Sequence, residues 1–171
     1  AAATLAAGLA APAAGAAVGT DSTAVTVSLG GGSFTIDAPD TATGSGSVTA
    51  LSSVNVGLSD TTVTDNRGTL LGWAITATSS GLTGPSSSSI GAANMSWATG
   101  TIATGSGGGG PLGSLTGITV GGGGSLVSAP VAVAALGKGG GVYTYPATIT
   151  VTVPVNAPAG DYTGSVVQTA L

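Results

Sequence analysis

The sequence predicts an all-β fold, an antiparallel β-sandwich. In several stretches apolar residues alternate with small polar ones, which is the period of a strand with one solvated face. Glycine-rich turn signals recur about every ten residues, a spacing typical of sandwiches of the Ig-like or Greek-key type. No stretch after residue 20 carries a sustained helical stripe. Helix is therefore expected to be minor.

The predicted strands are rich in Val, Ile and Thr, which fit a pleated, half-buried surface. Successive side chains of a strand point to opposite faces, so the alternation assigns one face of each strand to the core. The predicted strands span residues 24–29, 33–38, 53–58, 73–78 and 147–155.

Glycine supplies 32 of the 171 residues and gathers in tracts between the strands. The tracts are predicted to form loops or places where backbones pack closely. None is followed by the Lys-Ser/Thr pair that a phosphate-binding loop requires, so a nucleotide site is not expected. The tracts lie at residues 30–32, 43–47, 84–89, 105–111, 121–124 and 137–141.

The end of the chain is predicted to form a β-hairpin. Ile149, Val151 and Val153 share one face of the outgoing strand, residues 154–160 turn the chain, and the returning strand begins near Tyr162. Pairing of this last strand is expected to hold the C-terminal residues against the sandwich.

Residues 1–19 form an apolar, alanine-rich arm ahead of a single predicted domain at residues 20–171. The arm resembles the apolar part of an export signal, and its glycines and proline make it a poor membrane span. Two interpretations stay open: a signal remnant without a role, or an arm that buries itself on its own domain or along a neighbouring copy's sheet edge. The larger apolar side chains of the arm are Leu5, Leu9 and Val18.

Charged side chains are scarce, at 5% of the residues, and the formal net charge is -4. Only two residues are Lys or Arg, so the chain has no basic surface for phosphate backbones or anionic lipids. Neither nucleic acid nor a membrane is an expected partner. The positive mean hydropathy and low net charge also argue against intrinsic disorder.

The residue types that usually carry catalysis are missing, because the chain contains no His, Cys or Glu. The sequence therefore predicts a protein that is not an enzyme and that needs no cofactor. Zinc has no His or Cys ligands here. Calcium at Asp37, Asp40 or Asp21 is an alternative, and the simpler interpretation of Asp40 is a turn residue that bonds the following backbone.

Arg67 lies within "TDNRGTLLGW", residues 64–73, between an acid and a tryptophan. Its guanidinium can pair with a carboxylate through two parallel hydrogen bonds, and Asp65 lies on the same face of an extended chain. We expect Arg67 to hold the strand end before Trp73 by bonding a carboxylate and backbone carbonyls. The alternative is a surface contact with a glycan or an anionic wall polymer.

Aromatic residues make up only 4% of the chain, so Trp73 and Trp97 supply a large share of the available core volume. Both are expected to pack in the core, with sugar stacking as the alternative. The three tyrosines are expected to cap the ends of the sandwich with their hydroxyls in water. These are Tyr143, Tyr145 and Tyr162.

The segments "GSFTIDAPDTA" (32–42), "TVTDNRGTLLGW" (62–73) and "VTVPVNAPAGDYTGSV" (151–166) resemble the WxL-type surface domains of Gram-positive bacteria, and in particular their small secreted actinobacterial relatives. The resemblance implies a secreted β-sandwich at the cell surface that associates non-covalently with peptidoglycan. In the first Trp-x-Leu motif Ile75 stands in place of Leu, and in the second Gln168 stands in place of Trp. The resemblance therefore predicts the fold more strongly than it predicts peptidoglycan as the ligand.

Two functions remain in view. The first is a secreted, non-enzymatic structural subunit at the cell surface that self-assembles into a filament or pilus-like homopolymer, each copy lending its apolar arm to the next. The second is a monomeric WxL-like module that binds peptidoglycan or another cell-wall glycan through exposed aromatic side chains. Scarce Lys and Glu on the strand edges favours the first, because such residues usually prevent edge pairing.

Overall fold

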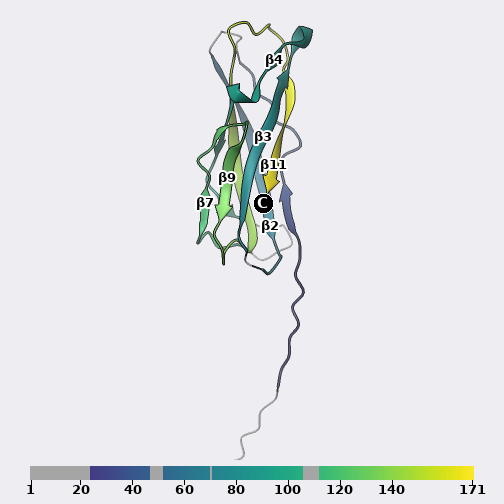
Figure 1. Cartoon of the computed structure of the whole chain (residues 1–171), viewed down its shortest axis with the longest axis vertical. Helices are drawn as coiled ribbons and strands as arrows, with labels where there is room; N and C mark the ends of the chain where they lie inside the picture. Colours follow the sequence, from purple (N-terminus) through teal and green to yellow (C-terminus); the bar gives the residue numbers. More distant parts are fainter. Residues whose placement is uncertain (1–23, 47–51, 70, 106–111) are drawn as a thin grey trace, which may run out of the picture.

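The computed structural model describes residues 24–46, 52–69, 71–105 and 112–171, and it has the predicted all-β architecture. Two antiparallel sheets pack face to face and form an elongated β-sandwich (Figure 1). The described residues contain no α-helix, only two short 3-10 turns, η1 (Pro85–Ser87) and η2 (Ala92–Asn94). None of the described residues belongs to a helix of the length and apolarity that crossing a membrane requires.

The first sheet is built around β10, which pairs on both sides. Its strands follow the order β1-β2-β10-β5-β8, with β6 pairing β10 beside β5. β1 covers only one end of β2, because its register runs from Phe34 opposite Asp65 to Asp37 opposite Thr62. The strands are β1 (Phe34–Asp37), β2 (Ser53–Asp65), β5 (Met95–Thr99), β6 (Ala103–Thr104), β8 (Gly124–Ser125) and β10 (Gly141–Thr152).

The second sheet has the order β11-β3-β9-β7, and the short β4 pairs with the far end of β3. β11 pairs only with β3 and is therefore an edge strand among the described residues. The strands are β3 (Trp73–Thr83), β4 (Ser89–Ile90), β7 (Ile118–Val120), β9 (Ala129–Ala134) and β11 (Thr163–Ala170).

The core lies between the sheets and follows the alternation of the sequence. In β10 the buried positions Tyr143, Tyr145, Ala147, Ile149 and Val151 alternate with Thr or Pro. β3 and β9 supply the opposite wall, and Trp97 of β5 belongs to the same core cluster. The inward-facing side chains form one continuous cluster.

Two glycines allow the backbone to approach the tryptophans closely. Gly139 has a φ of +94°, and a Cβ atom there would lie 2.6 Å from Trp73 Nε1. Gly123 has a φ of +64°, and its Cβ would lie 2.3 Å from the carbonyl oxygen of Trp97. Both come from predicted glycine tracts, so these tracts position the core as well as connecting strands.

The predicted C-terminal hairpin is wrong. β10 pairs with β2, β5 and β6, whereas β11 pairs with β3 in the other sheet. Residues 153–162 therefore connect the two sheets. Both edges of β10 are already occupied, and ten residues are enough to cross the spacing of about 10 Å between packed sheets. Alternation identifies the buried face of a strand and leaves its partner open.

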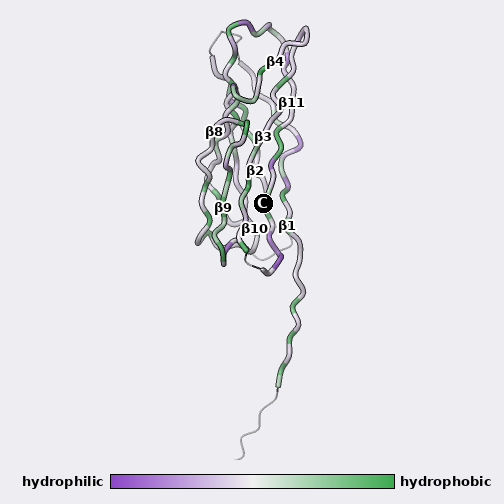
Figure 2. Tube along the Cα trace, viewed as in Figure 1, coloured by the Kyte–Doolittle hydropathy of each residue, from purple (hydrophilic) through white to green (hydrophobic). Residues whose placement is uncertain are grey.

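The predicted strand at residues 24–29 is also not formed. These residues are in no strand and are exposed along their whole length, including Val25, Val27 and Leu29 at 80%, 72% and 91%. The segment leaves the sandwich at the end where β1 begins (Figure 1), and its hydrophobic positions alternate with polar ones (Figure 2). The arm at residues 1–19, with Leu5, Leu9 and Val18, lies outside the described residues.

Candidate functional site

Arg67 and Asp65 form an ion pair at the end of β2, beside the point where the exposed segment leaves. Arg67 Nε donates to Asp65 Oδ1 at 2.9 Å, and Nη2 donates to Asp65 Oδ2 at 2.9 Å. The same Nη2 donates to the carbonyl oxygen of Gly72 at 3.0 Å. Arg67 thus bonds a carboxylate and a backbone carbonyl, the arrangement expected from the sequence, and joins the end of β2 to the start of β3.

Aromatic rings pack beside this ion pair. The Arg67 guanidinium lies 4.8 Å from the centre of the Phe34 ring. Phe34 meets Trp73 edge to face at 5.9 Å, and Trp73 meets Tyr143 in the same way at 5.8 Å. The row connects β1, β3 and β10 across both sheets, so it fixes the end of the sandwich from which residues 24–32 depart.

The electrostatics follow from burial and pairing. Burial of Asp65, which is 4% exposed, would raise the pKa of its carboxyl. Hydrogen bonds from the side chain and backbone of Arg67, together with its charge, outweigh this effect and lower the pKa below the ordinary value. The bond to Asp65 raises the pKa of Arg67. Both groups are therefore charged at neutral pH and form a structural ion pair.

Trp73 and Trp97 are 5% and 2% exposed, in the core as predicted. Their indole N–H groups also find partners inside the protein. Trp73 Nε1 donates to the carbonyl oxygen of Gly139 at 3.0 Å, and Trp97 Nε1 donates to Thr99 Oγ1 at 2.8 Å. Neither indole presents a face or a donor to a sugar at the surface.

The prediction that the tyrosine hydroxyls lie in water is wrong for Tyr143 and Tyr145, which are each 1% exposed. The Tyr143 hydroxyl donates to the carbonyl oxygen of Gly140 at 2.8 Å. The Tyr145 hydroxyl donates to Gln168 Oε1, and Gln168 Nε2 donates to Thr61 Oγ1 at 3.1 Å. Burial raises the pKa of both phenols above the ordinary value.

Gln168 therefore has a clear structural role, as a hydrogen-bonded bridge between the two sheets. It reaches from β11 in one sheet to β2 and β10 in the other. No sequence pattern indicates this contact, because Thr61, Tyr145 and Gln168 are far apart in the chain. Tyr162 is the half-buried tyrosine, and its hydroxyl donates to the carbonyl oxygen of Pro158 at 3.0 Å and contacts Ser88 Oγ.

A groove of about 780 Å³ opens on the side of the sandwich where β2 and β11 form the sheet margins. Its walls are largely aliphatic and come from both sheets, and residues 39–46 cross it. No sequence pattern predicts this groove, because it depends on which strands form the sheet edges. The Val, Leu and Ile residues that line it are Val54, Val56, Leu58, Leu82, Ile90, Ile149, Val151, Val153 and Val166.

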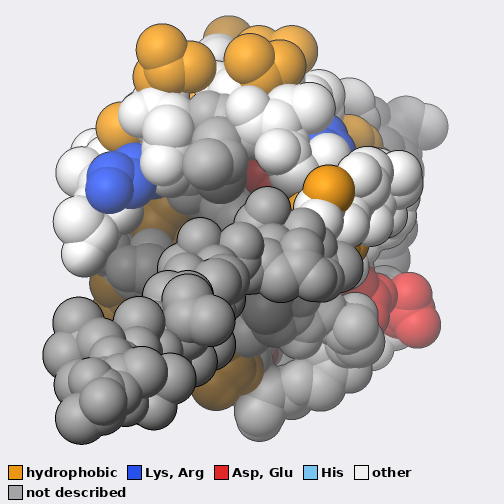
Figure 3. Space-filling view, turned by 90° about the horizontal axis from the view of Figure 1, so that it is seen from below, with side chains coloured by type: hydrophobic (Ala, Val, Ile, Leu, Met, Phe, Trp, Pro, Cys, Tyr) orange, Lys and Arg blue, Asp and Glu red, His pale blue; other side chains and the backbone are white. Residues whose placement is uncertain are grey.

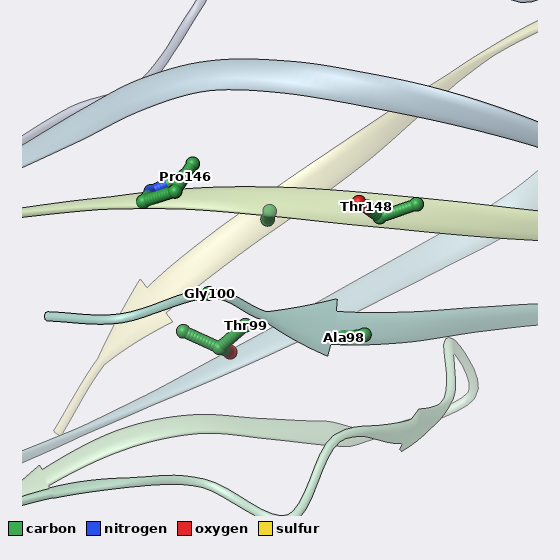
Figure 4. Close-up of a pocket in the computed structure, with 6 residues that line it drawn as sticks. Ala98, Thr99, Gly100, Pro146 and Thr148 are labelled. Carbon is green, nitrogen blue, oxygen red and sulfur yellow. The ribbon is translucent and has the colours of Figure 1, made fainter.

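A second depression, of about 170 Å³, lies on the first sheet between β5 and β10. Figure 4 shows Pro146 and Thr148 of β10 above Thr99 at the end of β5. The pairing of β10 with β2 shifts register between Tyr145 and Ala147, next to Pro146 in the lining of the hollow. Small uncharged residues line it, so it offers little to orient a ligand.

The described residues contain no group of three or more His, Cys, Asp or Glu side chains placed to hold a metal ion. Asp37 and Asp40 are exposed at the start of the connection from β1, and Asp21 lies outside the described residues. No family model matches the chain, and no curated protein or solved structure matches it. Function must therefore be inferred from the surface features of this fold.

Proposed function

We propose that this protein is an extracellular, non-enzymatic structural subunit that self-assembles through its exposed N-terminal segment. The observation that carries the proposal is the state of residues 24–29. They have the alternation of a strand and three highly exposed aliphatic side chains, Val25, Val27 and Leu29, yet they pair with no described strand. A strand from one copy can complete a sheet of another copy with both backbone hydrogen bonds and buried side chains.

The charge distribution supports association between copies. With six acidic and two basic residues in the chain, few charges oppose the approach of a second molecule. Figure 3 looks at the end of the sandwich from which the segment leaves and shows few Lys, Arg and acidic side chains among those that it colours. Association is therefore expected to depend on apolar burial and backbone pairing rather than on salt bridges, and to resist salt.

Apolar burial of the three side chains is comparable in size with the free-energy cost of association. Full burial of a Val or Leu side chain contributes about 1.5–3 kcal/mol, so burial of three such side chains contributes about 5–9 kcal/mol. Association costs about 4–15 kcal/mol in lost translational and rotational freedom. Apolar burial alone is thus comparable with the cost, and backbone hydrogen bonds of an added strand must supply the remainder.

The test compares two triple variants by size-exclusion chromatography with light scattering and by electron microscopy. Val25→Ser, Val27→Ser and Leu29→Ser together are expected to weaken self-association at least about a hundredfold, since each lost aliphatic side chain costs more than 1 kcal/mol. The control replaces three other aliphatic residues by Ser, namely Val127, Val155 and Leu136, which are 63%, 66% and 77% exposed. The control is expected to assemble like the unaltered chain. Equal behaviour of the two variants would contradict the proposal.

The WxL-like alternative, attachment to peptidoglycan through exposed aromatic side chains, has less support. Trp73 and Trp97 are buried with bonded indole N–H groups. Sedimentation of the protein with purified cell wall gives the decisive comparison. A monomer that sediments with the wall would favour the alternative over self-assembly.

A further inference from the structure

The side of the sandwich that carries the groove has an unpaired sheet edge. β11 pairs through one edge with β3, and no described strand pairs with its other edge. Figure 1 shows β11 at the margin of the second sheet. Residues 163–166 of β11 also line the groove, so a strand added at this edge would place every second side chain in it.

The lining of the groove matches an aliphatic strand. Val54, Val56 and Leu58 face it from β2 and are only half-buried, while Ile149 and Val151 face it from β10. Core side chains elsewhere in the sandwich, such as those of Ala77 and Val131, are fully covered. The sandwich thus leaves part of its apolar interior incompletely filled on this side.

Residues 39–46 cover the groove with backbone rather than with large side chains. A Cβ atom on Gly44 would lie 2.6 Å from Val56 Cγ2, and one on Gly46 would lie 2.5 Å from Val54 Cγ2. The segment forms no strand and is mostly exposed. It therefore rests on the inner valines of β2 and leaves the volume beside β11 open.

We propose that this groove, with the free edge of β11, receives residues 24–29 of a second copy of the chain. The inference rests on the proposed function and names its acceptor site. Val25, Val27 and Leu29 would enter the groove, and Thr26 and Ser28 would join the polar outer face of the sheet. The inserted segment carries no charge, so it brings none into the apolar site.

Val27 and Leu29 cannot reach the β2 wall of the groove in their own molecule. Gly32 is fixed at the base of the sandwich, where its N–H donates to the carbonyl oxygen of Asn66 at 2.7 Å. Val27 lies five residues from Gly32 and can reach about 17 Å from it, whereas Val56 lies ten residues along β2 from Asn66, a distance of about 33 Å. The donor must come from a neighbour.

The donor segment, residues 24–29, and the acceptor groove lie toward opposite ends of the sandwich. The segment leaves beside Arg67 and points away from the body (Figure 1), and the groove lies beside the other end of β2. Each copy therefore offers a donor at one end and an acceptor toward the other. Such a heterologous contact gives an open chain of subunits when its rotation does not close.

Disulfide trapping tests the acceptor site, because the chain has no cysteine of its own. Val27→Cys is placed in one full-length copy and Val166→Cys in a second copy with a tag of different size. The matched control is Val167→Cys, the next residue of β11, which faces outward and is 55% exposed. Val25→Cys and Leu29→Cys repeat the experiment one step along the strand in each direction, so that the register is covered.

Mixing and mild oxidation are expected to give the heterodimer with Val166→Cys at least ten times faster than with Val167→Cys for one of the three donors. Equal rates, or faster reaction with Val167→Cys, in a mixture that still assembles would overturn the acceptor site and leave the proposed function standing. A mixture of correctly folded chains that stays monomeric at every concentration would overturn both. Circular dichroism of each variant establishes that it is folded.

Discussion

Replacement of Arg67 tests how the base of the sandwich is held together. In Arg67→Ala the carboxylate of Asp65, 4% exposed, loses two side-chain hydrogen bonds of 2.9 Å and keeps only the bond of 3.1 Å from the backbone N–H of residue 67. Removing one partner of a fully buried ion pair costs about 3–5 kcal/mol. Because the Arg67 side chain is 29% exposed, the lower end of this range applies, and we expect a loss of about 3 kcal/mol.

Two further variants separate the contributions of the Arg67 charge, its planar guanidinium and the Asp65 carboxylate to stability. Arg67→Lys keeps the charge but loses the planar fork that bonds Asp65 and Gly72 together, so we expect an intermediate loss of about 1–2 kcal/mol. Arg67→Ala combined with Asp65→Asn should cost less than the sum of the two single changes, since no uncompensated carboxylate remains. The free energy of unfolding is measured by urea titration with tryptophan fluorescence.

The acid dependence follows from the direction of the pKa shift. A carboxyl whose pKa is lower in the folded state contributes stability that is complete above its ordinary pKa of 3.8 and is lost as the pH falls through the lowered value. Asp65→Asn should therefore flatten the loss of stability below that pH. A loss of less than about 0.5 kcal/mol in Arg67→Ala at neutral pH would refute the reasoning, because it would mean that Asp65 is well solvated without its partner.

Three further outcomes are expected. Tyr145→Phe removes the donor to Gln168 Oε1 and should lower the free energy of unfolding by about 1–2 kcal/mol in the same urea titration. Gly139→Ala should cost more than about 2 kcal/mol, because its φ is +94° and its Cβ would lie 2.6 Å from Trp73 Nε1, whereas Gly122→Ala, with no atom within 4 Å of its Cβ, should be nearly neutral. Burial raises the pKa of the Tyr145 phenol, so its ultraviolet titration should lag behind that of free tyrosine, and stability should fall as the pH rises above the ordinary value of 10.0.

Local contacts could be predicted from the sequence. Arg67 follows Asp65, the last residue of β2, by only two positions, so their side chains can meet whatever the rest of the fold does. The burial of Trp73 and Trp97 follows similarly, because each lies in an alternating stretch with few other large side chains to fill a core. Predictions of this kind depend on periodicity and side-chain chemistry alone.

Strand pairing could not be predicted in the same way. The alternation before and after residues 153–162 is equally compatible with a hairpin and with a crossing between sheets. What decides is that β10 is occupied on both edges by β2 and by β5 and β6, and this depends on strands far away in the sequence. The burial of the Tyr145 hydroxyl could not be predicted for the same reason. Its hydrogen-bond acceptor, Gln168, lies on β11 in the opposite sheet.

The segment at residues 24–29 shows most directly that alternation alone does not predict strand pairing. Its alternation is as regular as that of β10, yet it forms no strand and is exposed along its whole length. Alternation indicates that a segment can pair and bury one face. Whether it does so depends on the edge that it meets, and the part of β11 that lines the groove, residues 163–166, lies toward the far end of the sandwich from Gly32.

Edge composition gives an independent reason to connect this segment with β11. Soluble β-proteins usually protect an exposed edge strand with Lys, Pro or an inward-facing charge, since unpaired backbone groups otherwise attract other chains. β11 reads "TGSVVQTA" and carries none of these over its eight residues. The groove beside it is lined by aliphatic side chains of β2 and β10. An unprotected edge is a hazard for a monomer but is required of a strand that accepts a partner. The missing protection on β11 and the exposed valines at residues 24–29 are thus explained together if each forms half of one contact between copies.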